Sequence, residues 1–209
     1  SANGVTPEAL TVGSVSMNTE VETDAETGME IETETGDATL SYFTPAGPAR
    51  GDTVLKPDVV APAENLTGAI AGTGNATGAL INTGAYAAAY TAGVAARGWA
   101  AQPNLSAMEI KALVVNTAVS DKVKGDSGEY LFSINGEEQA YPFVTKAEVP
   151  FMGTGLVNGD NAAKAKAVIW ETSSYQPSLA FGFMEATNNR SETRNITIKN
   201  MTDEVQNYT

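Results

Sequence analysis

The stretch INTGAYAAAYTAGVAARGWAA, residues 81–101, is built from alanine, glycine and aromatic residues and contains one charged residue, Arg97. Its apolar residues fall on every side of a helical wheel, which predicts a buried helix rather than an amphipathic surface helix. A loop rich in glycine, threonine and asparagine leads into it over 71–84. We therefore expect a buried central helix over 84–99 that begins where this loop ends.

The composition limits the class of protein. The chain has 209 residues, of which 42% are hydrophobic and 18% are charged, as is usual for a folded globular protein. Its formal charge of −13 argues against a nucleic acid or an anionic membrane as partner, because both would repel it. The apolar runs are too short for a membrane span. Cysteine and histidine are both absent, so these residues cannot form a disulfide, a thiolate metal site or a complete Ser-His-Asp triad.

The segments around the expected helix carry strand and turn patterns. Residues 8–17 predict a buried strand, and residues 19–39 alternate acidic with apolar or threonine residues around the turn sequence AETG, which is typical of a β-hairpin. Prolines between 41 and 69 exclude a helix there. Residues 104–119 predict a second helix, with Ser106 as its N-cap and Glu109 completing a capping box.

The last third of the chain changes character near residue 171. Residues 120–150 predict an irregular excursion with a hairpin, and residues 158–169 predict a short helix that leads into a strand. Beyond Trp170 the apolar residues alternate, as is typical of β-sandwich strands: Leu179, Phe181, Phe183, Ile196 and Ile198. About three strands fit before Thr209, too few to close a sandwich. We therefore expect a truncated β-sandwich segment at the end of the chain.

Several stretches, taken in order, resemble segments of the subtilisin-like serine peptidases, or subtilases. They are PEALTVGSV (7–15), SYFTPAGPARGDTVLKPDVVAP (41–62), LSAMEIKALVVNTA (105–118) and FMGTGLVNGDNAAKA (151–165), with LKPDVVAP a near-perfect match to the family sequence. The tail from 178 to 209 is similar to the fibronectin type III-like domain of large secreted subtilases. Several motifs in the family's order indicate common descent more strongly than any single motif does.

The family's nucleophile motif reads Ser-Gly-Thr-Ser-Met-Ala-Ala-Pro-His-Val-Ala-Gly, and its second serine falls on Ala85. A methyl group cannot attack a carbonyl, so the resemblance implies a site without covalent catalysis. An engineered Ser-to-Ala substitution explains only the difference from the family motif at position 85. The change of Met to Tyr86, Pro to Ala89 and His to Tyr90 favours a natural pseudoenzyme. A shifted alignment with Thr83 as the nucleophile would place the hydroxyl before the helix start, away from its dipole.

Other parts of the family site fall near or beyond the first residue. The catalytic Asp and His motifs of the family would lie upstream of Ser1, which leads us to expect a fragment. Asn3 in SANG is the candidate for the family's oxyanion asparagine. The family sequence is Ala-Gly-Asn, whereas here the glycine follows the asparagine. The alternatives for Asn3 are an ordinary turn and a cloning remnant.

The expected fold is α/β, with part of a subtilase-type, mainly parallel sheet and helices on both faces. Residues 1–170 form the C-terminal half of the peptidase domain, with insertions at 19–39 and 120–150, and residues 171–209 begin the fibronectin type III-like domain. The missing N-terminal half of the same domain is one expected partner.

Eight carboxylates between residues 20 and 37 raise the hypothesis of a structural calcium ion, but their spacing favours a solvated hairpin face, so no cofactor is expected.

Three functions remain open from the sequence. The first is an inactive, extracellular or cell-surface subtilase homologue that binds a peptide or protein ligand in or near the former cleft. The second is a piece of an active serine endopeptidase lineage with an inactivating change. The third is a purely structural exoprotein module without a cleft.

Overall fold

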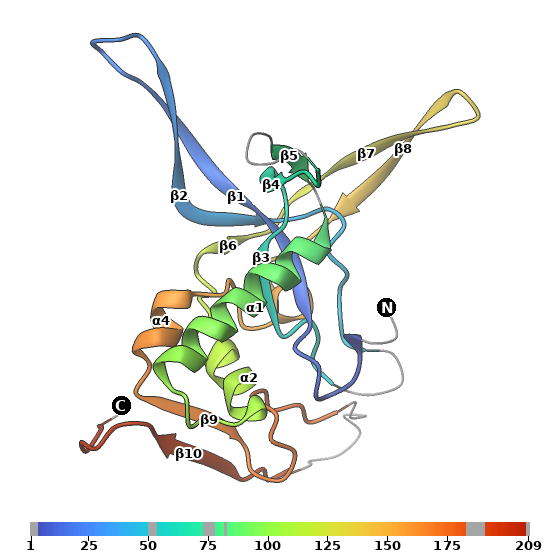
Figure 1. Ribbon diagram of the computed structural model, residues 1–209. Helices are drawn as coiled ribbons and strands as arrows, with labels where there is room; N and C mark the ends of the chain where they lie inside the picture. Colours follow the sequence, from blue (N-terminus) through green and yellow to red (C-terminus); the bar gives the residue numbers. More distant parts are fainter. Residues whose placement is uncertain (1–3, 50–53, 73–77, 82, 183–190, 208–209) are drawn as a thin grey trace.

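A small mixed sheet organises the body of the protein, and two long β-hairpins, only one of them part of this sheet, project from the body (Figure 1). The computed structural model describes residues 4–49, 54–72, 78–81, 83–182 and 191–207. The sheet has the order β3-β1-β2-β6. Its strands are β1 (Val12–Thr23), β2 (Glu30–Leu40), β3 (Val59–Pro62) and β6 (Val123–Lys124). The prediction of an α/β fold is confirmed at the level of a mixed α/β protein with a partly parallel sheet.

Strand direction departs from the expectation of a mainly parallel sheet. β1 pairs with β3 in parallel and β2 pairs with β6 in parallel, but the longest pairing, β1 with β2, is antiparallel. The reason is that the strand predicted at 8–17 continues without a break into the first half of the acidic hairpin. The hairpin predicted over 19–39 is confirmed, and its two strands belong to the sheet rather than standing beside it.

Both faces of the sheet are covered. Side chains alternate along β3, so that Val59 and Ala61 face the core that contains α1 and α2, while Val60 faces a second, smaller core with Met152 and Leu156. The helices are α1 (Gly84–Ala101), α2 (Ala107–Asn116), α3 (Val149–Met152) and α4 (Gly159–Lys164). The second face is therefore covered by the short helix α3 and the segment that follows it.

The helix predicted over 84–99 forms as α1, but the prediction that it is buried on all sides is wrong. Its buried residues make one stripe at helical spacing, which is Ala87, Thr91, Val94 and Gly98. At Gly98 a Cβ atom would lie 2.8 Å from Leu113 Cδ2, so the missing side chain allows α2 to approach closely. The remaining faces of α1 expose alanines, because no other described element packs against them.

The predicted start of α2 is confirmed in detail. The Ser106 hydroxyl accepts a hydrogen bond from the Glu109 backbone N–H, and the Glu109 carboxylate accepts one from the Ser106 N–H. Glu109 also binds Lys199 at 2.7 Å, which ties α2 to the last strand.

Three smaller antiparallel sheets complete the described structure. They are β4 (Leu66–Ala69) with β5 (Gly78–Ile81), β7 (Ser127–Ile134) with β8 (Glu137–Val144), and β9 (Ala167–Glu171) with β10 (Ile196–Asn200). The hairpin expected within 120–150 is confirmed as β7–β8, which turns at Asn135 and Gly136, both with positive φ. The short helix and strand expected over 158–169 are confirmed as α4 and β9.

The tail after Trp170 contains one strand in its described part, β10, and it pairs with β9. The alternating residues Leu179 and Phe181 do not form a strand, because no neighbouring strand offers them backbone partners; Phe183 lies outside the described residues. β9 itself places Val168 and Trp170 in the main core. Whether a β-sandwich begins here stays a prediction.

Candidate functional site

The start of α1 lies at the carboxyl end of β3, beside the segment Val12–Val15 of β1 that pairs with β3 in parallel. Thr83, the N-cap residue, donates its backbone N–H to the Ala63 carbonyl at 2.9 Å, directly after β3. At Gly84 a Cβ atom would lie 3.2 Å from the Ser14 hydroxyl of β1, so glycine allows the helix to begin close to the sheet. In open α/β sheets, ligands bind at the carboxyl ends of the strands. The first turn of α1 is therefore the candidate site.

Ala85 is the second residue of α1, and its side chain is exposed at the helix start. Its backbone N–H is 3.5 Å from the Thr83 hydroxyl, a long and weak hydrogen bond. The amides of a helix's first turn have no partner within the helix and carry its positive dipole end. The Tyr86 N–H already donates to the Thr83 carbonyl at 3.0 Å. The weakly bonded Ala85 N–H is thus the donor that this position can offer to a ligand, while its methyl group can supply no nucleophile.

The tyrosines that follow Ala85 take different positions. Tyr86 is half-buried, whereas Tyr90 is 50% exposed and lines an open groove of about 580 Å³ between α1 and α4. Arg97 and Asp160 form an exposed ion pair along the same groove. Tyr90 therefore contributes to a surface that runs along α1 away from Ala85.

The other predicted site residue, Asn3, lies outside the described residues, so its role as an oxyanion asparagine stays a prediction. The acidic hairpin does lie within them. Its register places Glu30, Glu32 and Glu34 on one face and Glu20 and Glu22 on the other. In the described part of the chain, no group of three or more Asp or Glu side chains is arranged to hold a metal ion.

A buried ion cluster that was not predicted from the sequence lies between α2 and the segment that leads into β3. The Asp58 carboxylate contacts Lys56 Nζ at 2.7 Å and Lys111 Nζ at 3.5 Å, and it accepts the Thr11 backbone N–H at 2.7 Å. All three charged side chains are buried. Burial lowers the pKa of Lys111, and the Asp58 charge opposes that shift.

The cluster connects four separate parts of the chain. Lys56 donates to the Ala9 carbonyl at 2.7 Å, and Lys111 donates to the Pro7 carbonyl and to Gln176 Oε1, the latter at 2.9 Å. Because every charged group has partners, the arrangement is that of a structural cluster, not of a free acid or base. The signal in the sequence was the presence of Lys56 and Asp58 inside LKPDVVAP and of Lys111 inside an apolar helix.

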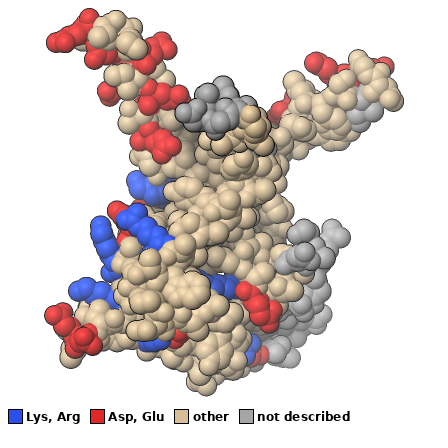
Figure 2. All heavy atoms as spheres, in the orientation of Figure 1, with Lys and Arg blue, Asp and Glu red and all other residues tan. Residues whose placement is uncertain are grey.

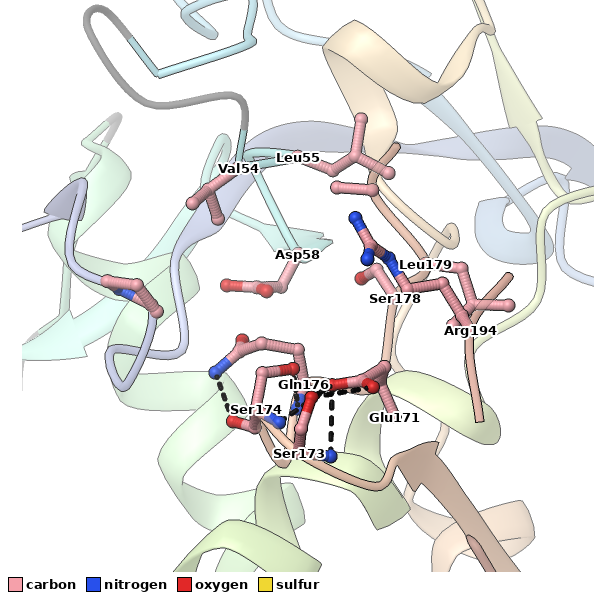
Figure 3. A pocket seen from close by; sticks show the side chains of 12 residues that line it. Val54, Leu55, Asp58, Glu171, Ser173, Ser174, Gln176, Ser178, Leu179 and Arg194 are labelled. Carbon is pink, nitrogen blue, oxygen red and sulfur yellow. Dashed lines mark hydrogen bonds between the residues drawn. The ribbon is translucent and has the colours of Figure 1, made fainter. Parts of the chain in front are cut away.

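A cleft of about 290 Å³ opens beside this cluster, with Asp58, Glu171, Arg194 and three serines in its lining (Figure 3). Glu171 is buried at its edge, at the end of β9. Hydrogen bonds from the Ser174 hydroxyl, the Ser173 hydroxyl and the Ser174 backbone N–H lower the pKa of Glu171 to about 2. Glu171 is therefore ionised, and its carboxylate holds the turn that follows β9.

Two projecting hairpins leave the body at the same end as the start of α1 (Figure 1). We call residues 19–34 of β1–β2 the acidic arm and residues 127–144 of β7–β8 the aromatic arm. Acidic side chains are visible along both arms, and basic side chains gather on the body near the base of the acidic arm (Figure 2). There, Asp37 contacts Lys122 at 3.2 Å and Lys124 at 2.8 Å, and the hydrogen bond from Lys124 contributes most to lowering the Asp37 pKa.

Together, the partly parallel sheet and a glycine-led helix that starts at the carboxyl end of β3 define a mixed α/β protein, with the candidate site at Ala85. Comparison with family models finds a match to the subtilase family over residues 1–147. The match spans well over half of the chain, which therefore belongs to the subtilase family. A search of curated proteins found no match. None of the helices in the described residues has the length and apolarity that crossing a bilayer requires.

Proposed function

We propose that this chain is a catalytically inactive subtilase homologue that binds a peptide or protein ligand at the former active-site end. The observation that carries the proposal is the exposed methyl group of Ala85 at the first turn of α1, at the carboxyl end of β3. Covalent acyl transfer needs a nucleophile at this point, and alanine has none. Binding needs only the backbone donors of the helix start and the surfaces around it, which remain.

The changes around Ala85 support natural loss of catalysis over a single inactivating substitution in an active enzyme. Met, Pro and His of the family motif correspond to Tyr86, Ala89 and Tyr90 in this chain. Tyr90 is half-exposed on the groove beside α1, where a large ring alters the surface that a ligand would meet. One engineered substitution would leave these three positions unchanged.

A second proposed partner is the N-terminal half of the same domain. Beyond the first turn, α1 exposes a face of small residues that no described element covers: Ala88, Ala89, Ala92 and Ala96. Alanine-rich helix faces permit close packing of another element. The resemblance to subtilases implies that upstream strands and helices of the domain supply this element.

We also propose that the protein acts outside the cell or at its surface, as the resemblance to large secreted subtilases implies. Antibody detection in culture medium, in a surface fraction and in cell lysate tests this. A signal confined to the lysate would count against it.

The absence of cysteine allows a direct test of binding at Ala85, because one introduced thiol is unique. Ala85→Cys would be labelled with a benzophenone maleimide, mixed with a tryptic digest of casein and irradiated. Ala100→Cys, at the exposed far end of α1, is the matched control. We expect peptide adducts at position 85 in clear excess over position 100. Equal capture at both positions, or none at 85, would contradict the proposal.

A further inference from the structure

The aromatic arm carries a continuous row of rings on one face. In the β7–β8 register, Tyr130 pairs with Tyr141, Gly128 pairs with Phe143, and Phe132 pairs with Gln139. Directly paired residues of antiparallel strands point to the same face, so these rings share one side of the hairpin. Tyr42, which follows β2, extends the row onto the body. We call this set the aromatic strip: Tyr42, Tyr130, Phe132, Tyr141 and Phe143.

The rings contact one another along the length of the arm. Tyr42 stacks on Tyr130 with 4.5 Å between ring centroids, and Phe132 stacks on Tyr141 with 4.6 Å. Tyr130 and Phe132 are linked by a tilted contact at 5.8 Å. Because the rings stack on one another, their positions are fixed before a ligand binds. Binding therefore costs less conformational entropy than binding to free side chains would.

The strip is open to solvent although it is aromatic. Tyr130 is 42% exposed and Tyr141 is 47% exposed. Both strands form a two-stranded sheet in the described structure, so the outer edge of each lacks a neighbouring strand there. Exposed aromatic patches of this kind mark interaction surfaces more often than isolated exposed rings do.

Charge indicates the kind of partner. Glu137 lies on the same face as the strip, at the tip of the arm, and Glu64 lies near enough to Tyr42 to act on it electrostatically. The arm, SGEYLFSINGEEQAYPFV, has no lysine or arginine, and its other two glutamates, Glu129 and Glu138, lie on the opposite face, where they add to the negative charge of the arm. Cations are attracted both by the faces of aromatic rings and by nearby carboxylates.

We propose that the aromatic strip is a docking surface for a basic peptide segment, whose Arg or Lys side chains lie on the rings between Glu64 and Glu137. An extended peptide would place alternate side chains on the strip, at the spacing of the arm's own strands. The strip does not rest on binding at Ala85, and either surface can bind without the other.

The test measures the affinity of the whole chain for labelled peptides by fluorescence anisotropy. The probe is an alternating Arg-Gly peptide of about ten residues, a length similar to that of the arm. The comparison ligands are an alternating Glu-Gly peptide and a cello-oligosaccharide. We expect the basic peptide to bind, with an affinity that falls as salt rises from about 0.05 M to about 0.5 M. Binding of the oligosaccharide in place of the basic peptide would overturn the proposal.

Variants on the two faces of the arm separate docking from general charge attraction. Tyr130→Ser with Tyr141→Ser should weaken binding roughly tenfold. Leu131→Ser with Val144→Ser changes the opposite face, where the two side chains are 59% and 62% exposed, and should change binding less than about twofold. An equal loss in both pairs would overturn the proposal.

A second double variant tests whether a loss of binding comes from unfolding of the hairpin. Tyr130→Leu with Tyr141→Leu keeps apolar bulk on the strip but removes the ring faces, so affinity should fall while circular dichroism stays unchanged. Full binding by this leucine pair would show that ring faces are not needed and would overturn the proposal.

Discussion

At the scale of single residues, the buried ion cluster depends on the carboxylate of Asp58. It is a buried carboxylate between two buried ammonium groups, and removing one partner of such a cluster leaves the others charged and uncompensated. Lys56 and Asp58 lie in the segment that leads into β3 and Lys111 lies in α2, so the cluster fixes how these parts of the chain meet. Its presence explains why charged residues stand inside otherwise apolar segments.

Asp58→Asn should therefore lower the free energy of unfolding by about 3–5 kcal/mol, because Lys56 and Lys111 lose their counter-ion. Urea unfolding at neutral pH measures this. Asp160→Asn is the control, since its pair with Arg97 is exposed and should contribute at most about 1 kcal/mol. Similar losses from both variants would show that burial of the Asp58 cluster does not matter.

Protonation of Glu171 makes the free energy of unfolding depend on pH in the acid range. Because its pKa is lowered from 4.5 to about 2 in the folded protein, folding favours the carboxylate form. The stabilisation is present above the unfolded pKa of 4.5 and should be lost as the pH falls towards 2.

Urea unfolding between about pH 6 and about pH 3 should show this loss, and Glu171→Gln should flatten the slope. Ser178→Ala, in the same cleft, should leave the slope as in the unsubstituted protein. An unchanged slope in Glu171→Gln would mean that other groups control the acid transition.

At the scale of elements, sequence patterns predicted local structure well where the local chemistry is self-sufficient. The capping box at Ser106 and the hairpin turn at Asn135–Gly136 are determined by hydrogen bonds and φ preferences within a few residues. The burial of α1 was predicted less well, because composition cannot show which faces of an alanine-rich helix have neighbours. The missing strand at Leu179 has the same cause, since alternation indicates a strand only where another strand is available to pair.

The acidic arm contributes little to the cores that stabilise the body. Neither core cluster contains a residue between Thr19 and Asp37, and the pairing of β1 with β2 shifts register between Met17 and Thr19, at the base of the arm. The arm carries acidic side chains on both faces, which discourages edge-to-edge pairing with other chains.

Replacing residues 20–34 with a short glycine-containing turn should change the free energy of unfolding by no more than about 1 kcal/mol. Leu40→Ala, at the buried end of the same strand, should cost about 2–5 kcal/mol. Thermal or urea unfolding compares the two variants. A large loss on shortening the arm would show that it supports the body.

At the scale of the whole molecule, the order of several motifs along the chain predicted more of the structure than any single local pattern did. The position of Ala85 at the start of a helix followed from several motifs in sequence, and the family match over residues 1–147 covers those at 7–15, 41–62 and 105–118 but not the one at 151–165. The ion cluster joins residues as far apart as Pro7, Asp58, Lys111 and Gln176, and such long-range contacts leave no periodic signal. The rings on the aromatic arm likewise became one surface only through strand register.

The most direct measurement of inactivity is labelling with a fluorophosphonate, which reacts with activated serine nucleophiles. It would be applied to the complete gene product and to its Ala85→Ser variant, with an active subtilisin as the positive control. A naturally inactive homologue, altered at Tyr86, Ala89 and Tyr90 as well, should remain unlabelled in both forms. Stoichiometric labelling of Ala85→Ser would show that the rest of the catalytic machinery is intact and would contradict natural loss of catalysis.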